Sequence, residues 1–163
     1  MTDSMTVALP SADELAEIVD QVWSSFLEGE IVPLAEPELD QDYAGRLVGW
    51  VSISGDWTGH LSVVCSEDAA CAIATDMFQL DAGEVSTSEI ADALGEIANM
   101  VGGSVKGMVG ASVALSLPQV VLDAAALVSP ETHRLVTVQA HWKDELVEFS
   151  LWERKPGHNG GKE

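Results

Sequence analysis

The stretch "STSEIADALGEIANMVGGSVKGMVG", residues 86–110, carries the longest helical pattern in the sequence. Its apolar residues recur every three or four positions and form one stripe, made of Ile90, Leu94, Ile97, Val101, Val105 and Met108. Such a stripe predicts an amphipathic helix that packs one face on a sheet. Ser86, followed three positions later by Glu89, has the pattern of a capping box and predicts the start of the helix.

The opposite face of this helix combines polar and very small residues. It carries Asp92, Gly95, Glu96, Asn99, Gly102, Gly103 and Lys106. Each glycine inside a helix costs about 0.8–1 kcal/mol relative to alanine, so the three together cost on the order of 2–3 kcal/mol. Two explanations are open: another helix of the same chain crosses closely here, or the face stays open for a partner. The second avoids burying the Glu96 carboxylate.

The composition limits the classes of partner. The 163 residues fit one domain, and 27 acidic residues against seven basic ones give a net charge of −20. This charge disfavours binding to nucleic acid or to an anionic membrane, and it favours a partner with exposed lysines. No apolar run reaches the roughly 18–20 residues of a membrane span. The first ten residues lack the pattern of a secretory signal.

The two cysteines and the chain's end lead to further expectations. Cys65 and Cys71 stand in apolar surroundings, so we expect small core residues in a reducing compartment, the cytoplasm. No Cys/His spacing is typical of zinc, and we expect no cofactor of the chain's own. We expect one domain over residues 1–155 and a flexible tail over residues 156–163.

The rest of the chain predicts an α/β protein with helices packed on an antiparallel sheet. Helical patterns cover residues 11–29 and 66–80. Residues 45–66 and 133–154 read as two hairpins, which turn near Gly55-Asp56 and Lys143-Asp144. Residues 112–122 are expected to be extended, with Pro118 at a strand end or sheet edge.

The first and third helices resemble each other. When residues 13–26 are placed over residues 92–105, six positions are identical. The hairpins after them also correspond, so we predict a duplicated helix–hairpin unit. The first helix has Asp20 in place of Asn99 and Trp23 in place of Gly102. We therefore expect its outward face, with Glu17, Asp20, Trp23 and Ser24, to be bulkier and to lack the amide.

Glu96 and Asn99 lie one turn apart and suggest a limited chemistry. A carboxylate can pair with a lysine, and a carboxamide can orient a water because it both donates and accepts hydrogen bonds. The sequence has no adjacent nucleophile and no Walker-type phosphate loop. The pair could act if the partner supplied an activated electrophile together with its metal.

At these residues the sequence resembles the CheX-like members of the CheC/CheX/FliY phosphatases of bacterial chemotaxis. Their signature is Glu-x-x-Asn on a long helix, in a context close to "ALGEIANMVGG". The resemblance implies hydrolysis of the aspartyl phosphate on a CheY-like receiver domain. Glu96 would bind the receiver's active-site lysine, Asn99 would orient the attacking water, and Mg²⁺ would belong to the receiver. Because Asp20 cannot donate a hydrogen bond when ionised, one site is expected.

The resemblance also suggests a homodimer that forms by joining sheets. We expect the receiver to contact the chain at Gly95, Gly102, Gly103 and Lys106. Two other functions are open: a module that binds the phosphorylated receiver without hydrolysing it, and a rotor-type structural protein related to FliM. The presence of both Glu96 and Asn99 favours the phosphatase over the structural protein.

Overall fold

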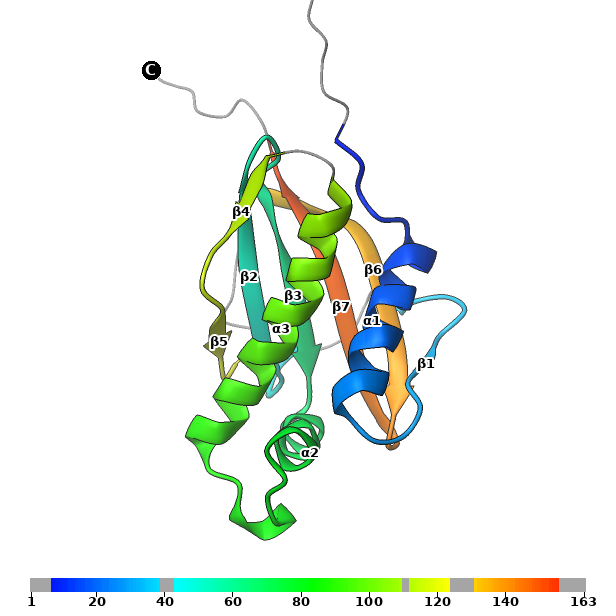
Figure 1. Cartoon of the computed structure of the whole chain (residues 1–163). Coiled ribbons are helices and arrows are strands. Elements are labelled where there is room, and N and C mark those ends of the chain that lie inside the picture. Colours follow the sequence, from blue (N-terminus) through cyan, green and yellow to red (C-terminus); the bar gives the residue numbers. More distant parts are fainter. Residues whose placement is uncertain (1–6, 39–42, 110–111, 124–130, 156–163) are drawn as a thin grey trace, which may run out of the picture.

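The computed structural model describes residues 7–38, 43–109, 112–123 and 131–155. Helical segments and groups of strands follow one another along the chain (Figure 1). Their order is α1 (Ala12–Phe26), β1 (Val32–Pro33), β2 (Leu47–Gly55), β3 (Gly59–Cys65), α2 (Glu67–Phe78), the short 3-10 helix η1 (Ala82–Glu84), α3 (Thr87–Val109), β4 (Val113–Leu115), β5 (Gln119–Val121), β6 (Thr132–Trp142) and β7 (Glu145–Arg154).

The sheet is antiparallel, with the strand order β1-β6-β7-β3-β2-β4, and β5 also pairs with β2. This order is symmetric about the central pair of β7 and β3. The short strands of each half pair with the hairpin of the other half. Strand β1 follows α1 in the chain but pairs with β6, whereas β4 and β5 follow α3 but pair with β2. The halves therefore interlock in one sheet, in agreement with the predicted duplication.

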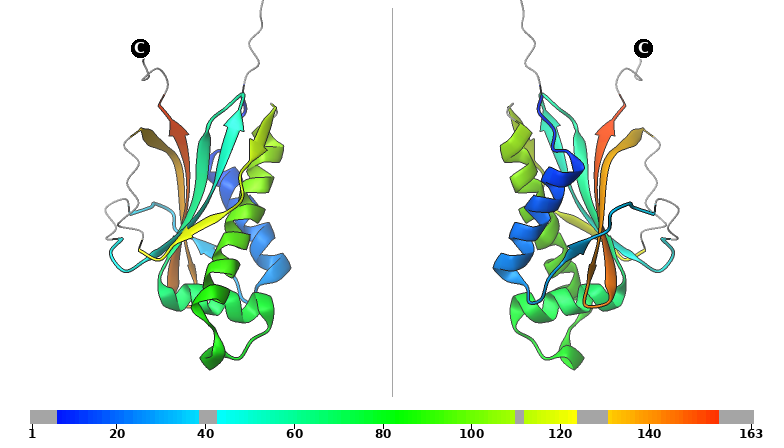
Figure 2. Two further views of the ribbon diagram at one scale, coloured as in Figure 1. Left: turned by 90° about the vertical axis from the view of Figure 1, so that its left-hand side faces the viewer. Right: turned by 90° about the vertical axis from the view of Figure 1, so that its right-hand side faces the viewer.

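Helices α1 and α3 lie side by side on one face of the sheet, and α2 runs crosswise near the start of α3 (Figure 2). The core fills the space between these helices and the sheet. Leu94, Ile97 and Val101 of the predicted stripe are fully buried there. Met108, at the end of the stripe, is half-buried.

Local signals set the ends of the elements. The Ser86 hydroxyl accepts a hydrogen bond from the Glu89 N–H at 3.1 Å, and Glu89 Oε1 accepts one from the Ser86 N–H at 2.9 Å, as a capping box requires. The second hairpin turns through Lys143 and Asp144, both with positive φ, as in a two-residue turn of type I′. Strand β1 lies between the predicted helix at residues 11–29 and the predicted hairpin at residues 45–66, where the sequence predicted no strand.

Trp23 corrects one prediction about α1. Its side chain was expected on the outward face, but it is 1 % exposed and packs edge-on against Trp142 and Phe149, with ring centroids 5.5 Å and 5.7 Å away. An indole ring buries a large apolar area, and this gain favours an inward position for Trp23. The largest side chain of α1 therefore lies inside the molecule.

Cys65 is buried and Cys71 is partly exposed, and both are free thiols. Burial raises the pKa of the Cys65 thiol to about 12, which keeps it protonated and unreactive at neutral pH. No helix among the described residues is long and apolar enough to cross a membrane. The predicted flexible tail, residues 156–163, lies outside the described residues.

Candidate functional site

Glu96 and Asn99 lie in the middle of α3, on the side of the helix that faces away from the sheet. The Glu96 side chain is exposed, Asn99 is half-buried, and the intervening Ile97 and Ala98 are fully buried. Within the described part of the chain, no hydrogen bond or ion pair engages either side chain. The carboxylate and the amide are therefore available to water or to a partner.

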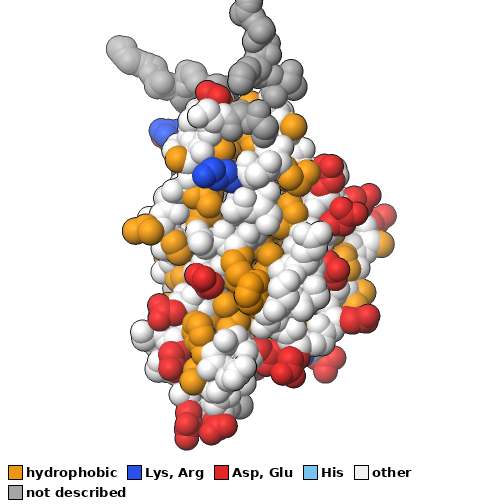
Figure 3. All heavy atoms as spheres, viewed as in Figure 1, with side chains coloured by type: hydrophobic (Ala, Val, Ile, Leu, Met, Phe, Trp, Pro, Cys, Tyr) orange, Lys and Arg blue, Asp and Glu red, His pale blue; other side chains and the backbone are white. Residues whose placement is uncertain are grey.

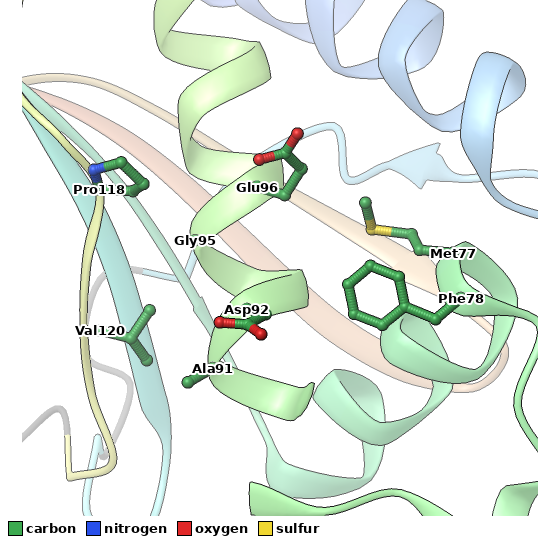
Figure 4. A pocket seen from close by; sticks show the side chains of 8 residues that line it. All are labelled: Met77, Phe78, Ala91, Asp92, Gly95, Glu96, Pro118 and Val120. Atoms are coloured by element: carbon green, nitrogen blue, oxygen red, sulfur yellow. The ribbon is translucent and has the colours of Figure 1, made fainter. Parts of the chain in front are cut away.

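A shallow groove of about 540 Å³ crosses α3 next to this pair. It is lined by Met77, Phe78, Ala91, Asp92, Gly95, Glu96, Pro118 and Val120. Figure 4 shows the two α2 side chains on one side of α3 and the side chains of Pro118 and Val120 on the other. Three segments distant in the sequence thus surround the first half of the Glu/Asn face.

The charges around the groove are acidic. Its two charged lining residues are Asp92 and Glu96, which lie one turn apart on α3. Figure 3 shows acidic side chains over the half of this face where α2 and the first turns of α3 lie, with apolar side chains exposed between them. A basic surface on a partner would complement this charge.

Lys106 is exposed in the last turn of α3. It follows Glu96 by ten residues, or about 15 Å along the helix axis, which exceeds the screening length of about 8 Å at physiological salt. Lys106 therefore does not neutralise Glu96. Its charge lies at the C-terminal end of the helix, where a cation interacts favourably with the helix dipole.

The three glycines of α3 that were predicted on its outward face have different surroundings. A β-carbon added at Gly103 would meet nothing within 4 Å, so this residue is on the open face as predicted. Gly95 is buried, and a β-carbon there would lie 3.5 Å from Pro118 Cβ and 3.6 Å from Val120 Cγ2, which are ordinary contact distances. Gly95 therefore belongs to the floor of the groove and not to a freely open face.

Gly102 corrects the prediction of a partner-contacting residue on the open face. It is buried, and an added β-carbon would overlap Val51 Cγ2 of strand β2 and lie 3.7 Å from Leu115 Cδ2. Its glycine allows the helix to approach the sheet closely, as Gly49 does on the β2 side beneath Leu94. The close approach is internal, although it involves a strand and not the second helix that was considered.

The corresponding outward face of α1 carries two carboxylates. Glu17, Asp20 and Ser24 are exposed, in agreement with the alignment of the two helices. Asp20 takes the place of the amide of Asn99, so an ionised side chain there accepts hydrogen bonds but donates none. Helix α1 thus repeats the spacing of the Glu96/Asn99 pair, but it lacks the hydrogen-bond donor that the Asn99 amide supplies.

The sequence did not predict the walls of the groove. Met77 and Phe78 come from the end of α2, and Pro118 and Val120 come from the extended segment around β5. The only signal in the sequence was Pro118, which was expected at a strand end or edge and directly precedes β5. Among the described residues, no group of three or more His, Cys, Asp or Glu side chains is placed to hold a metal ion.

The comparisons with solved structures concern the fold. A complex described as CheX-CheY-BeF3-Mg+2 from Borrelia burgdorferi matches with a TM-score of 0.74 and 15% identity, covering 91% of this chain and 100% of that one. CheX from Vibrio vulnificus matches with a TM-score of 0.69 and 18% identity, over 86% of this chain and 95% of that one. FliY from Thermotoga maritima has a TM-score of 0.55 at 16% identity and covers 92% of each chain.

The comparison with family models concerns ancestry. No curated protein sequence matches the chain significantly. The family model described as "Chemotaxis phosphatase CheX" matches residues 47–140, more than half of the chain and the part that contains Glu96 and Asn99. The chain therefore belongs to the CheX family of chemotaxis phosphatases.

Proposed function

We propose that this protein hydrolyses the aspartyl phosphate of a CheY-like receiver domain. The observation that carries the proposal is the pair of Glu96 and Asn99, one turn apart on the outward face of α3 and without a partner in the described part of the chain. Membership of the CheX family supports it. A similar fold occurs in a protein solved in complex with CheY, which supports a receiver as the partner.

The proposed reaction needs few functional groups from this chain. The oxygen of a water attacks phosphorus, the bond from phosphorus to the aspartate oxygen breaks, and the products are aspartate, inorganic phosphate and a proton. In this proposal, the Asn99 carbonyl accepts a hydrogen bond from the water, and its NH₂ group donates one to a phosphoryl oxygen. The amide thereby holds the water in line with the bond that breaks.

Glu96 has a different role in the proposal. Its exposed carboxylate would pair with the lysine of the receiver's active site, which orients the receiver on α3. Docking excludes water, so this ion pair becomes stronger than an exposed one. The Mg²⁺ ion belongs to the receiver and would neutralise charge on the phosphoryl group there.

Phosphate release from phosphorylated receivers tests the proposal. The wild-type chain is expected to accelerate release from its receiver, and Glu96→Ala should slow it by raising KM. Asn99→Ala should lower the rate by about 10²–10³, the usual cost of removing one oriented group from a transition state. A wild-type chain that binds phosphorylated receivers but does not accelerate release would instead favour the binding module.

Two further expectations stay predictions. The homodimer that the resemblance suggests would give twice the chain mass of 17.3 kDa in light scattering. The cytoplasmic location would be checked by cell fractionation. Neither is required for the proposed chemistry, because both proposed functional side chains belong to one helix of one chain.

A further inference from the structure

The groove beside Glu96 has more structure than the Glu/Asn chemistry requires. One wall is apolar, with Met77 and with Phe78, which is 40 % exposed. The other wall is Pro118 and Val120. Between the walls, α3 contributes the small residues Ala91 and Gly95 and the acidic residues Asp92 and Glu96. The result is a depression with apolar walls that begins at the proposed catalytic face.

The walls are held in place. The N–H of Ser116 donates to the Ser52 carbonyl at 2.9 Å, and the Ser52 N–H donates to the Ser116 hydroxyl at 2.9 Å. The segment that leads into Pro118 is therefore tied to β2 in both directions. On the other side, Phe78 is the last residue of α2, and Gln79 closes the helix with a left-handed backbone. The groove is therefore built before any partner binds, which lowers the entropy cost of binding.

The charge and the position of the groove indicate its occupant. The charged lining residues are Asp92 and Glu96, both acidic, and Glu96 also belongs to the proposed phosphatase site. A partner docked on Glu96 therefore covers the groove as well. Because the walls are apolar and the rim is acidic, the complementary surface is an apolar side chain with a lysine or arginine beside it.

We propose that the groove receives an apolar side chain of the phosphorylated receiver, and that Asp92 pairs with a basic residue next to it. This inference rests on the proposed function and adds the feature by which the chain selects its receiver. Phe78 is the main anchor, since its partly exposed aromatic ring offers a large apolar area and aromatic residues are enriched at interfaces. Gly95 keeps the groove open.

Two variants test the groove from opposite directions. Phe78→Ser removes a wall, and Gly95→Leu fills the floor, where the first added carbon fits without overlap. Each should raise the Kd for the receiver, measured by titration with the phosphorylated domain, by about tenfold or more. Each should raise KM far more than it lowers kcat. The melting temperature should stay near that of the wild type, which separates lost binding from lost folding.

Phe26→Ser is the matched control. Phe26 is the last residue of α1, as Phe78 is of α2, and it is 52 % exposed. The Kd of the Phe26→Ser variant for the receiver should stay within about twofold of wild type.

Asp92→Asn should weaken binding of the receiver several-fold at low salt and make the Kd less dependent on salt.

The possible results separate the two proposals. If the wild-type chain neither binds receivers nor releases phosphate, the proposed function fails and this inference fails with it. If the wild-type chain releases phosphate but Phe78→Ser and Gly95→Leu keep the wild-type KM and Kd, the groove inference alone is overturned. Weaker binding in both variants, with an unchanged Phe26→Ser control, supports it.

Discussion

Helices α1 and α3 have a similar spacing of apolar residues and lie on the same face of the sheet, and two of the aligned positions at which they differ separate their packing and their chemistry. On the inward side, α1 has Trp23, which packs on Trp142 and Phe149, whereas α3 has Gly102, which lies against Val51. The duplicated unit thus fills the same space in two ways, with a large side chain in one half and with a closely packed backbone in the other.

On the outward side, the difference is chemical. The pair on α3 is a carboxylate and an amide, and the pair on α1, Glu17 and Asp20, is two carboxylates. Two carboxylates repel a phosphoryl group, and neither donates a hydrogen bond when ionised. The two positions are three residues apart, about 60° around the helix, so the boundary between the inward and the outward face of each helix runs between them.

The largest effect is expected from the inward position of α1. Trp23→Ala should lower the free energy of unfolding by about 3–5 kcal/mol, because it leaves a large cavity against Trp142 and Phe149. The indole Nε1 is buried without a hydrogen-bond partner among the described residues, so the loss is one of packing alone. Urea denaturation measures it, and Trp23→Phe should recover much of the loss. A change below about 1 kcal/mol would show that the indole is not an essential part of the core.

The outward position of α3 should give the next largest effect. Asn99→Asp makes the α3 pair the same as that of α1, and turnover should fall by at least about 10²-fold because the donor is lost and negative charge is added. The melting temperature should change little, since aspartate and asparagine have similar helix propensities. Phosphate release and a thermal melt on the same protein check both statements. An active Asn99→Asp variant would remove the chemical difference between the helices.

Two neighbouring glycines should give smaller effects of opposite sign. Gly102→Ala should destabilise the protein by about 1–3 kcal/mol, because its β-carbon overlaps the Val51 side chain. Gly103→Ala should stabilise it by up to about 1 kcal/mol, since the residue faces open space and alanine favours the helix. Thermal melts of the two variants give the comparison. Equal shifts would mean that Gly102 has no special contact with the sheet.

Much of the fold could be predicted from the sequence because its signals are local. The Ser86–Glu89 capping box, the stripe through Leu94 and Ile97 and the turn at Lys143-Asp144 each depend on residues close together in the chain. The pairing of β1 with β6, in contrast, depends on residues more than a hundred positions apart. No local pattern in two residues, Val32 and Pro33, could indicate it.

The candidate site could be predicted only in part. Glu96 and Asn99 were found because a helix fixes the relation between neighbours one turn apart. Gly102 was assigned to the wrong side because the edge of the exposed face depends on how closely α3 approaches Val51 of β2, a contact between residues distant in the sequence. The groove was missed for the same reason, since α2 and the residues around Pro118 meet only in the folded chain.

The central claim is that the outward face of α3, and not that of α1, carries the phosphatase chemistry. The most direct measurement is phosphate release by Asn99→Ala and Asp20→Ala in parallel, because these variants truncate aligned positions on the two helices. We predict that Asn99→Ala loses about 10²–10³ of the wild-type rate. Asp20→Ala should stay within a few-fold of it, as should Glu17→Ala. An equal, large loss in Asn99→Ala and Asp20→Ala would mean two working sites, and an unchanged rate in Asn99→Ala would contradict the account.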